Sequence, residues 1–182
     1  MWPSVARRRA TRIARDWYEV VFHPRLFFRS VNERDRGQRA ALGFFAVVVL
    51  VARLPEFVVA GDPARIVAVA AILLLLSPVV LHFLTGLQYL LLWLVTDEDA
   101  GVDRTLRALA YGSAPGVLAA APYLGAASFV GIYAVAVGLQ EGHGLGPLRA
   151  TVGASLPGLL LFGLVFDGFD AAIEVWRLAV GA

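Results

Sequence analysis

The sequence predicts an all-α integral membrane protein, with five transmembrane helices preceded by an N-terminal amphipathic helix at the membrane interface. Three observations lead to this fold class. The chain of 182 residues is 59% hydrophobic and only 16% charged, which is more apolar surface than one soluble core of this size buries. Its uncharged stretches are long enough to cross a bilayer. Its basic residues are concentrated in residues 1–39.

The distribution of charge is uneven although the formal net charge is only +2. All 16 basic residues are Arg, and most of them precede the first long apolar run. We interpret this start as a cytoplasmic basic tail on a membrane protein, and nucleic-acid binding is the weaker interpretation. The tail has Arg where a cleaved signal peptide has an apolar core, so we expect it to be retained. The lack of Cys excludes disulfides and cysteine-based metal chemistry.

Residues 1–38 are predicted to form a basic amphipathic segment at the cytoplasmic membrane surface. Within residues 2–22, aromatic and aliphatic side chains share one arc of a helix and Arg side chains lie beside it. Pro24 ends this helix, and Ser30 with Glu33 forms a capping box for the helix that leads into the first span. The alternative is a tail that is merely solvated. The residues expected at the lipid surface are Trp2, Arg8, Arg12, Arg15, Trp17, Phe27 and Phe28.

Residues 39–182 are predicted to form one transmembrane domain of five spans. The uncharged run of the first span is too short to cross the bilayer core, so Arg53 and Glu56 must lie within its outer half. The second runs from Arg65 without charge to Asp97, about 46 Å if helical, with a kink at Pro78. Prolines divide the next uncharged run into two short spans. The predicted spans are about 40–60, 65–95, 103–121, 123–140 and 148–168.

An odd number of spans places the two termini on opposite sides of the membrane. Thirteen Arg residues fall on the side of the N-terminus, against Arg53, Arg65 and Arg177 on the other. The positive-inside rule therefore predicts a multi-pass protein of the cell membrane with a cytoplasmic N-terminus and an extracytoplasmic C-terminus.

The stretch from Arg107 to Gly116 is interpreted as the start of a third span that bends. Tyr111, Gly112 and Pro115 combine an aromatic ring, a small residue and a helix breaker. Small residues recur four apart here and in residues 127–138, which favours close helix contacts in lipid. We therefore expect a close helix crossing with the tyrosine at the interface and an opened backbone turn, and tight packing of the third to fifth spans.

This stretch also resembles the Yip domain family, integral membrane proteins whose eukaryotic members were named for interacting with Ypt/Rab GTPases. Three segments carry the resemblance: the Tyr-Gly dipeptide three residues before Pro115, the segment from Phe22 to Phe28, and the loop from Gly138 to His143 with Leu148-Arg149-Ala150. It covers about residues 18–165 and is closest to a prokaryotic-type member, without the long N-terminal region of the eukaryotic proteins. The resemblance implies five spans and a cytoplasmic N-terminus.

Several ionisable residues are candidates for a polar site within the membrane. The carboxylates of Asp167, Asp170 and Glu174 are spaced i, i+3 and i+7, so they share one helical face. This acidic face is either a cation or proton site, or a solvated helix end with a Glu174–Arg177 pair. A third interpretation is that Arg53 pairs with Glu56 or Asp167, because a guanidinium at this depth requires a partner. The candidate residues are His82, Arg53, Glu56, Asp167, Asp170 and Glu174.

His82 is the one histidine inside a predicted span. It is either a proton relay or a hydrogen-bonding residue that joins helices, for example to Ser113 or Tyr111. The sequence has no His-Glu-x-x-His metal motif and no Gly-x-Ser-Gly setting for a serine nucleophile, so we expect no enzyme, no catalytic residues, no metal and no cofactor.

The sequence favours a non-enzymatic Yip-like protein that organises membrane or scaffolds other proteins. Expected partners are a bilayer with anionic headgroups, a second copy of the chain or other membrane proteins, and no nucleic acid. The alternative function is a small transporter or channel for a cation, proton or small solute, with Pro78, His82 and the bend from Tyr111 to Pro115 along its path. Polar residues are scarce in the predicted spans, and this scarcity favours the scaffold over a transporter or channel.

Overall fold

The computed structural model describes residues 3–33, 37–95, 101–121 and 123–180, and every regular element in these ranges is a helix. The N-terminal part consists of α1 (Pro3–Phe22), α2 (Pro24–Glu33), α3 (Gln38–Ala52) and α4 (Leu54–Ala60). The middle consists of α5 (Pro63–Val95), α6 (Val102–Gly112), η1 (Ala114–Ala120) and η2 (Leu124–Val130). The C-terminal part consists of α7 (Gly131–His143), α8 (Pro147–Leu160), the π-helical turn η3 (Leu161–Val165) and α9 (Gly168–Val180).

Three helices in the described ranges are long and apolar enough to cross a membrane. They are Pro63–Leu94, Leu124–His143 and Pro147–Val165, while Gln38–Ala52 is apolar but shorter. The other two predicted spans are interrupted helices. The first breaks at Arg53 between α3 and α4, and the third breaks at Ser113 between α6 and η1. An all-helical membrane fold follows, and the count of five spans stays a prediction.

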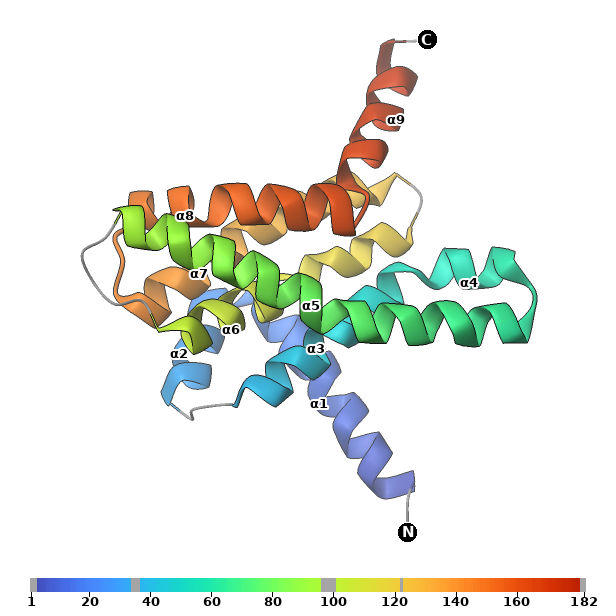
Figure 1. Cartoon of the computed structure of the whole chain (residues 1–182), viewed down its shortest axis with the longest axis horizontal. Coiled ribbons are helices and arrows are strands. Elements are labelled where there is room, and N and C mark those ends of the chain that lie inside the picture. Colours follow the sequence, from blue (N-terminus) through green and yellow to red (C-terminus); the bar gives the residue numbers. More distant parts are fainter. Residues whose placement is uncertain (1–2, 34–36, 96–100, 122, 181–182) are drawn as a thin grey trace.

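The helices form a packed body from which three parts project (Figure 1). In the body, α7 packs against α6, α8 and α2, and α3 packs against α5, α6 and η1. Helices α1 and α9 leave the body in opposite directions, and α4 projects from one end together with the first half of α5. Helix α5 continues through Pro78 and changes direction near its middle, which agrees with the predicted kink.

The segment around Pro24 folds as predicted at its start and differently at its end. The residue before Pro24 lies outside the helical states, which separates α1 from α2. The predicted capping box at Ser30 is wrong, because Ser30 lies inside α2 and its hydroxyl donates to the carbonyl of Phe27, at 2.8 Å. A hydroxyl bonded to the preceding turn of its own helix does not cap the next one.

Close helix contacts in the body depend on glycine. A Cβ added at Gly112 on α6 would lie 2.5 Å from a methyl carbon of Val135 on α7 and 2.9 Å from the backbone nitrogen of that residue. A Cβ at Gly138 on α7 would lie 2.9 Å from the Cβ of Ala108 on α6. Distances below 3.0 Å leave no room for a side chain, so the two backbones touch here. The predicted close crossing of these helices is confirmed.

Candidate functional site

A charged cluster centres on Arg53, where the junction of α3 and α4 meets the turn between η3 and α9. Pro55 has no backbone N–H, and its ring would clash with the carbonyl of Val51 in a continuous helix. Helix α3 therefore ends at Ala52, and Arg53 has φ −95° and ψ 8° between the two helices. The break places the side chain of Arg53 at the junction.

The guanidinium of Arg53 binds two carboxylates and a backbone carbonyl. One terminal nitrogen donates to Oε1 of Glu56, at 2.6 Å, and to Oδ2 of Asp167. The other donates to Oδ1 of Asp167, at 3.2 Å, and to the carbonyl oxygen of Val165, at 2.8 Å. The forked contact with Asp167 uses the planar geometry that pairs Arg with carboxylates. The predicted pairing of Arg53 is confirmed, with both proposed partners at once.

Asp167 reaches Arg53 because the chain turns sharply after α8. It has φ 52°, in the left-handed region that Asp tolerates better than most residues, and α9 begins at the following glycine. Arg53 is mostly covered, with 20% of its side chain exposed, whereas Glu56 and Asp167 are about half exposed. The cluster therefore ties α3 and α4 to the turn between α8 and α9 at the surface of the body.

The predicted acidic face does not assemble. Asp167 precedes α9 instead of belonging to it, and its carboxylate binds Arg53. Glu174 pairs with Arg177, at 2.9 Å, and both are more than half exposed, as the solvated helix end predicts. Within the ranges that the structure describes, no three carboxylate or histidine side chains lie close enough together to hold a metal ion. The cation-site interpretation of this face is wrong.

His82 lies on α5 with its ring largely exposed. Its Nδ1 is 2.6 Å from the carbonyl oxygen of Pro78, and its Nε2 is 3.3 Å from the side-chain nitrogen of Gln38 at the start of α3. The predicted bond to Ser113 or Tyr111 is wrong, because the two ring nitrogens of His82 contact Pro78 and Gln38 instead. His82 still contacts a second helix, through an amide that the sequence analysis did not single out.

Tyr111 is buried at the centre of an aromatic group. Its ring lies 5.0 Å from the ring of Phe27 on α2 and 5.1 Å from the ring of Phe44 on α3, measured between centroids. Phe27 and Phe28 are 1% and 2% exposed, so the prediction that they face lipid is wrong. The short α2 carries them beneath the body, where edge-to-face contact with Tyr111 stabilises three helices together. Pro115 is buried directly after the break that follows Tyr111 and Gly112.

Helix α1 contacts the body near its C-terminal end, through Trp17. Its indole nitrogen donates to the carbonyl of Ala114, at 2.8 Å, at the start of the 3-10 helix η1 that follows α6. Arg12 and Arg15 are exposed and pair along the helix with Asp16 and Glu19. Trp2 and the side chain of Arg8 lie outside the described residues. Exposed Arg side chains fit the predicted tail, whereas Trp17 has a structural partner that the sequence did not reveal.

A second polar cluster, which the sequence analysis missed, joins α2 to α6 and α7. Arg29 forms an ion pair with Glu141, at 2.7 Å, and this hydrogen bond and the negative charge of Glu141 raise the pKa of the Arg29 guanidinium. Asn32 donates to the backbone carbonyl of Glu141, at 3.1 Å, and Arg104 donates to the carbonyl of Gly142, at 2.9 Å. More than a hundred residues separate Arg29 from Glu141, so spacing along the chain carries no signal for this contact.

The long apolar helices and the close-packed glycines define an all-helical, multi-pass membrane protein. Comparison with protein families finds that the Yip1 domain matches residues 18–167. The chain therefore belongs to the Yip1 domain family, as the resemblance at Tyr111-Gly112 implied. The family is not a known enzyme family. Comparison with curated proteins and with solved structures finds no significant match.

Proposed function

We propose that this Yip1 family protein is non-enzymatic, and that it organises membrane or scaffolds other membrane proteins. The observation that carries the proposal is the use of polar side chains inside the body. The hydroxyls of Ser77 and Thr85 on α5 donate to carbonyls one turn earlier in the same helix, at 2.6 and 2.7 Å. The buried Gln88 donates to the carbonyl of Gly153 on α8, at 3.3 Å. These groups stabilise helices, whereas a permeation path requires polar atoms that face a lumen.

The outer surface supports the same proposal. Large apolar side chains are exposed along α5 and on α4, and they suit lipid or the helices of a partner. The partners that we propose are a bilayer with anionic headgroups, which the Arg side chains of α1 would contact, and a second copy of the chain or other membrane proteins. Nucleic acid is not among them.

The proposed topology counts each interrupted helix pair as one span. With α3–α4 and α6–η1 added to the three long helices, the chain crosses the cell membrane five times, with a cytoplasmic N-terminus and an extracytoplasmic C-terminus. The native chain has no Cys, so Asp62→Cys and Arg149→Cys each give a single reactive thiol. We expect an impermeant thiol reagent to label the first from outside intact cells and the second only after lysis. Labelling of both from the same side would contradict five spans.

A flux measurement separates the scaffold from a transporter or channel. The purified protein and its His82→Ala variant are reconstituted into liposomes that contain a pH-sensitive dye, and proton and potassium flux are recorded. We expect both proteins to match empty liposomes. A flux that the wild type supports and His82→Ala abolishes would overturn the scaffold proposal.

Photocrosslinking tests the scaffold directly. A photoreactive residue at the exposed Leu75 of α5 reports on neighbours in the native membrane, and the same residue at the buried Leu84 is the control. We expect discrete protein adducts or a crosslinked dimer from position 75 and mainly intramolecular products from position 84. Lipid adducts alone from position 75 would argue against a protein partner on this face.

A further inference from the structure

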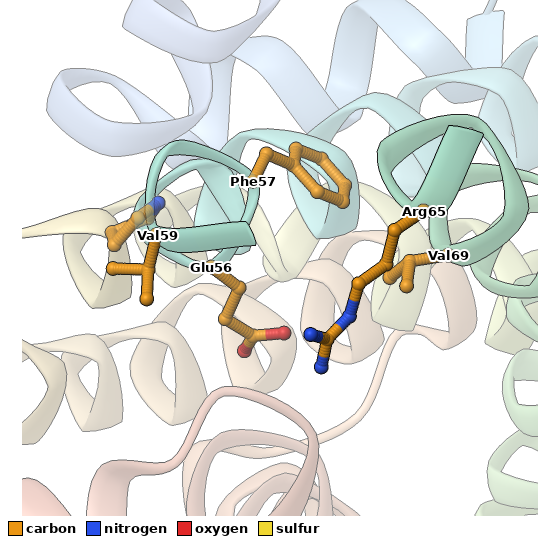
Figure 2. A pocket seen from close by; sticks show the side chains of 6 residues that line it. Glu56, Phe57, Val59, Arg65 and Val69 are labelled. Atoms are coloured by element: carbon orange, nitrogen blue, oxygen red, sulfur yellow. The ribbon is translucent and has the colours of Figure 1, made fainter. Parts of the chain in front are cut away.

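A cavity of about 420 Å³ lies between α4 and the first turns of α5, beside the Arg53 cluster. Figure 2 shows Glu56 from α4 and Arg65 from α5 projecting into it toward one another. The lining residues are Pro55, Glu56, Phe57, Val59, Arg65 and Val69. The cavity thus combines one negative and one positive side chain with an apolar wall.

The two charges are held apart. One oxygen of Glu56 accepts a hydrogen bond from Arg53, which fixes the carboxylate on the α4 side. Among the residues that the structure describes, no carboxylate lies within ion-pair distance of the exposed Arg65. A ligand group that carries a negative charge beside a positive one would complement both side chains, since each would find its opposite.

The cavity has a charged end and an apolar surface beside it, as a binding site for an amphiphilic ligand would. Its charges lie within two turns of the exposed connection at Gly61–Asp62, which is the polar end of the α4–α5 hairpin. The neighbouring Val59 and Val67 are 87% and 68% exposed, and apolar exposed side chains continue along α5. Helix α5 is long and apolar enough to span a membrane, so the part of this surface beside the cavity suits lipid acyl chains.

We propose that this cavity binds the headgroup of a phospholipid that carries a phosphate and a primary ammonium group, as phosphatidylethanolamine does. Arg65 binds the phosphate, the ammonium donates hydrogen bonds to Glu56, and the acyl chains follow the exposed face of α5. A headgroup without a cation leaves Glu56 facing a phosphate, which is unfavourable. A quaternary ammonium has no N–H to donate, so it loses the hydrogen bond to Glu56.

The test measures lipid binding by native mass spectrometry of the full chain released from nanodiscs of equal phosphatidylethanolamine, phosphatidylcholine and phosphatidylglycerol content. We expect the wild type to retain phosphatidylethanolamine about tenfold over the other two, since one charge-assisted hydrogen bond accounts for that ratio. Arg65→Gln should weaken retention of all three lipids. Glu56→Gln should remove the preference for phosphatidylethanolamine over phosphatidylglycerol.

Three further variants guard against misfolding and nonspecific charge effects. Val69→Trp fills the cavity and leaves both charges in place, so it should also reduce retention. Glu174→Gln and Arg177→Gln remove the exposed ion pair of α9 and should leave the lipid preference unchanged. Equal retention of all lipids by the wild type would overturn the proposal, and so would an Arg65→Gln variant that behaves as wild type.

Soluble glycerophosphoethanolamine distinguishes a lipid from its free headgroup. We expect it to compete only weakly with phosphatidylethanolamine, because it lacks the acyl chains that contact α5. Competition at equal concentration would overturn the assignment to a membrane lipid. The proposed scaffold role does not enter this experiment, so either proposal can fail without the other.

Discussion

The two halves of α5 are both predominantly apolar but have different surroundings. The first half, residues 63–76, is rich in Ala, Val, Ile and Leu, and most of its side chains are exposed beside the short α4. The second half buries Leu81, Leu84 and Leu92 against α3, α6 and α8. Apolar character alone therefore does not decide which residues pack together in this protein.

The difference between the halves lies in the partner surfaces. Leu92 fits against Gly153 of α8, where a Cβ would come within 2.6 Å of the leucine side chain. In a bilayer the hydrophobic effect does not draw helices together, so association requires a shape into which a side chain fits. The first half of α5 lies beside the seven-residue α4, and most of its side chains stay exposed, although Leu73 still packs against the core.

The strongest test of this contrast compares two leucines on α5. Leu81 is fully buried, and Leu75 is 75% exposed. We expect Leu81→Ala to lower the free energy of unfolding by about 2–3 kcal/mol, since it leaves a cavity among packed helices. Leu75→Ala should change it by less than about 0.5 kcal/mol. Denaturant unfolding in detergent micelles measures both. Equal losses would show that the first half of α5 is packed as well, for example in a dimer.

The second test changes the partner surface instead of the leucine. Gly112→Ala places a methyl group against the backbone of Val135, and we expect a loss of about 2 kcal/mol from overpacking. The matched control is Gly86→Ala on α5, where no described atom lies within 4 Å of the added Cβ. The control should be neutral or stabilise by up to about 1 kcal/mol, because Ala favours helix. A control that destabilises as much would argue against a specific crossing.

The crossing at Gly112 was predictable because small residues four apart imply close helices in any membrane fold. The all-helical class and the pairing of Arg53 were predictable for similar reasons, since apolar runs require spans and a deep guanidinium requires a carboxylate. These three inferences rest on local composition or on the general free-energy cost of an unpaired charge or unsatisfied backbone in a membrane. None of them depends on the exact path of the chain.

The sequence did not reveal contacts that depend on that path. Phe27 and Phe28 lie beside Arg residues and resemble an interfacial anchor, yet α2 packs against the body and buries both, Phe27 against Tyr111 and Phe28 near Gly138. Trp17 donates to the carbonyl of Ala114, which begins the separate helix η1 because α6 ends at Gly112. The left-handed turn at Asp167 likewise separates three carboxylates that share a face in an uninterrupted helix.

The smallest expected effect is at the junction between the projecting α4–α5 hairpin and the packed body. Asp167→Asn keeps a side chain that tolerates φ 52° but removes the charge opposite Arg53. We expect a loss of about 1 kcal/mol, because half of the Asp167 side chain is exposed and Glu56 and the carbonyl of Val165 still hold the guanidinium. Hydrogen exchange should rise in α4 and stay unchanged in α7, since only the projecting hairpin depends on this tie.

Charge reversal separates the ion pair from other consequences of substitution at this turn. Asp167→Arg should lose folded yield, through repulsion of Arg53 and through the left-handed backbone that Arg disfavours. Adding Arg53→Asp removes only the repulsion, so a partial recovery of folded yield measures the coupling of the two side chains. If neither single change alters the yield and the double variant shows no recovery, the cluster does not hold the hairpin. Shape complementarity with the body would then be the only tie between the two regions of the molecule.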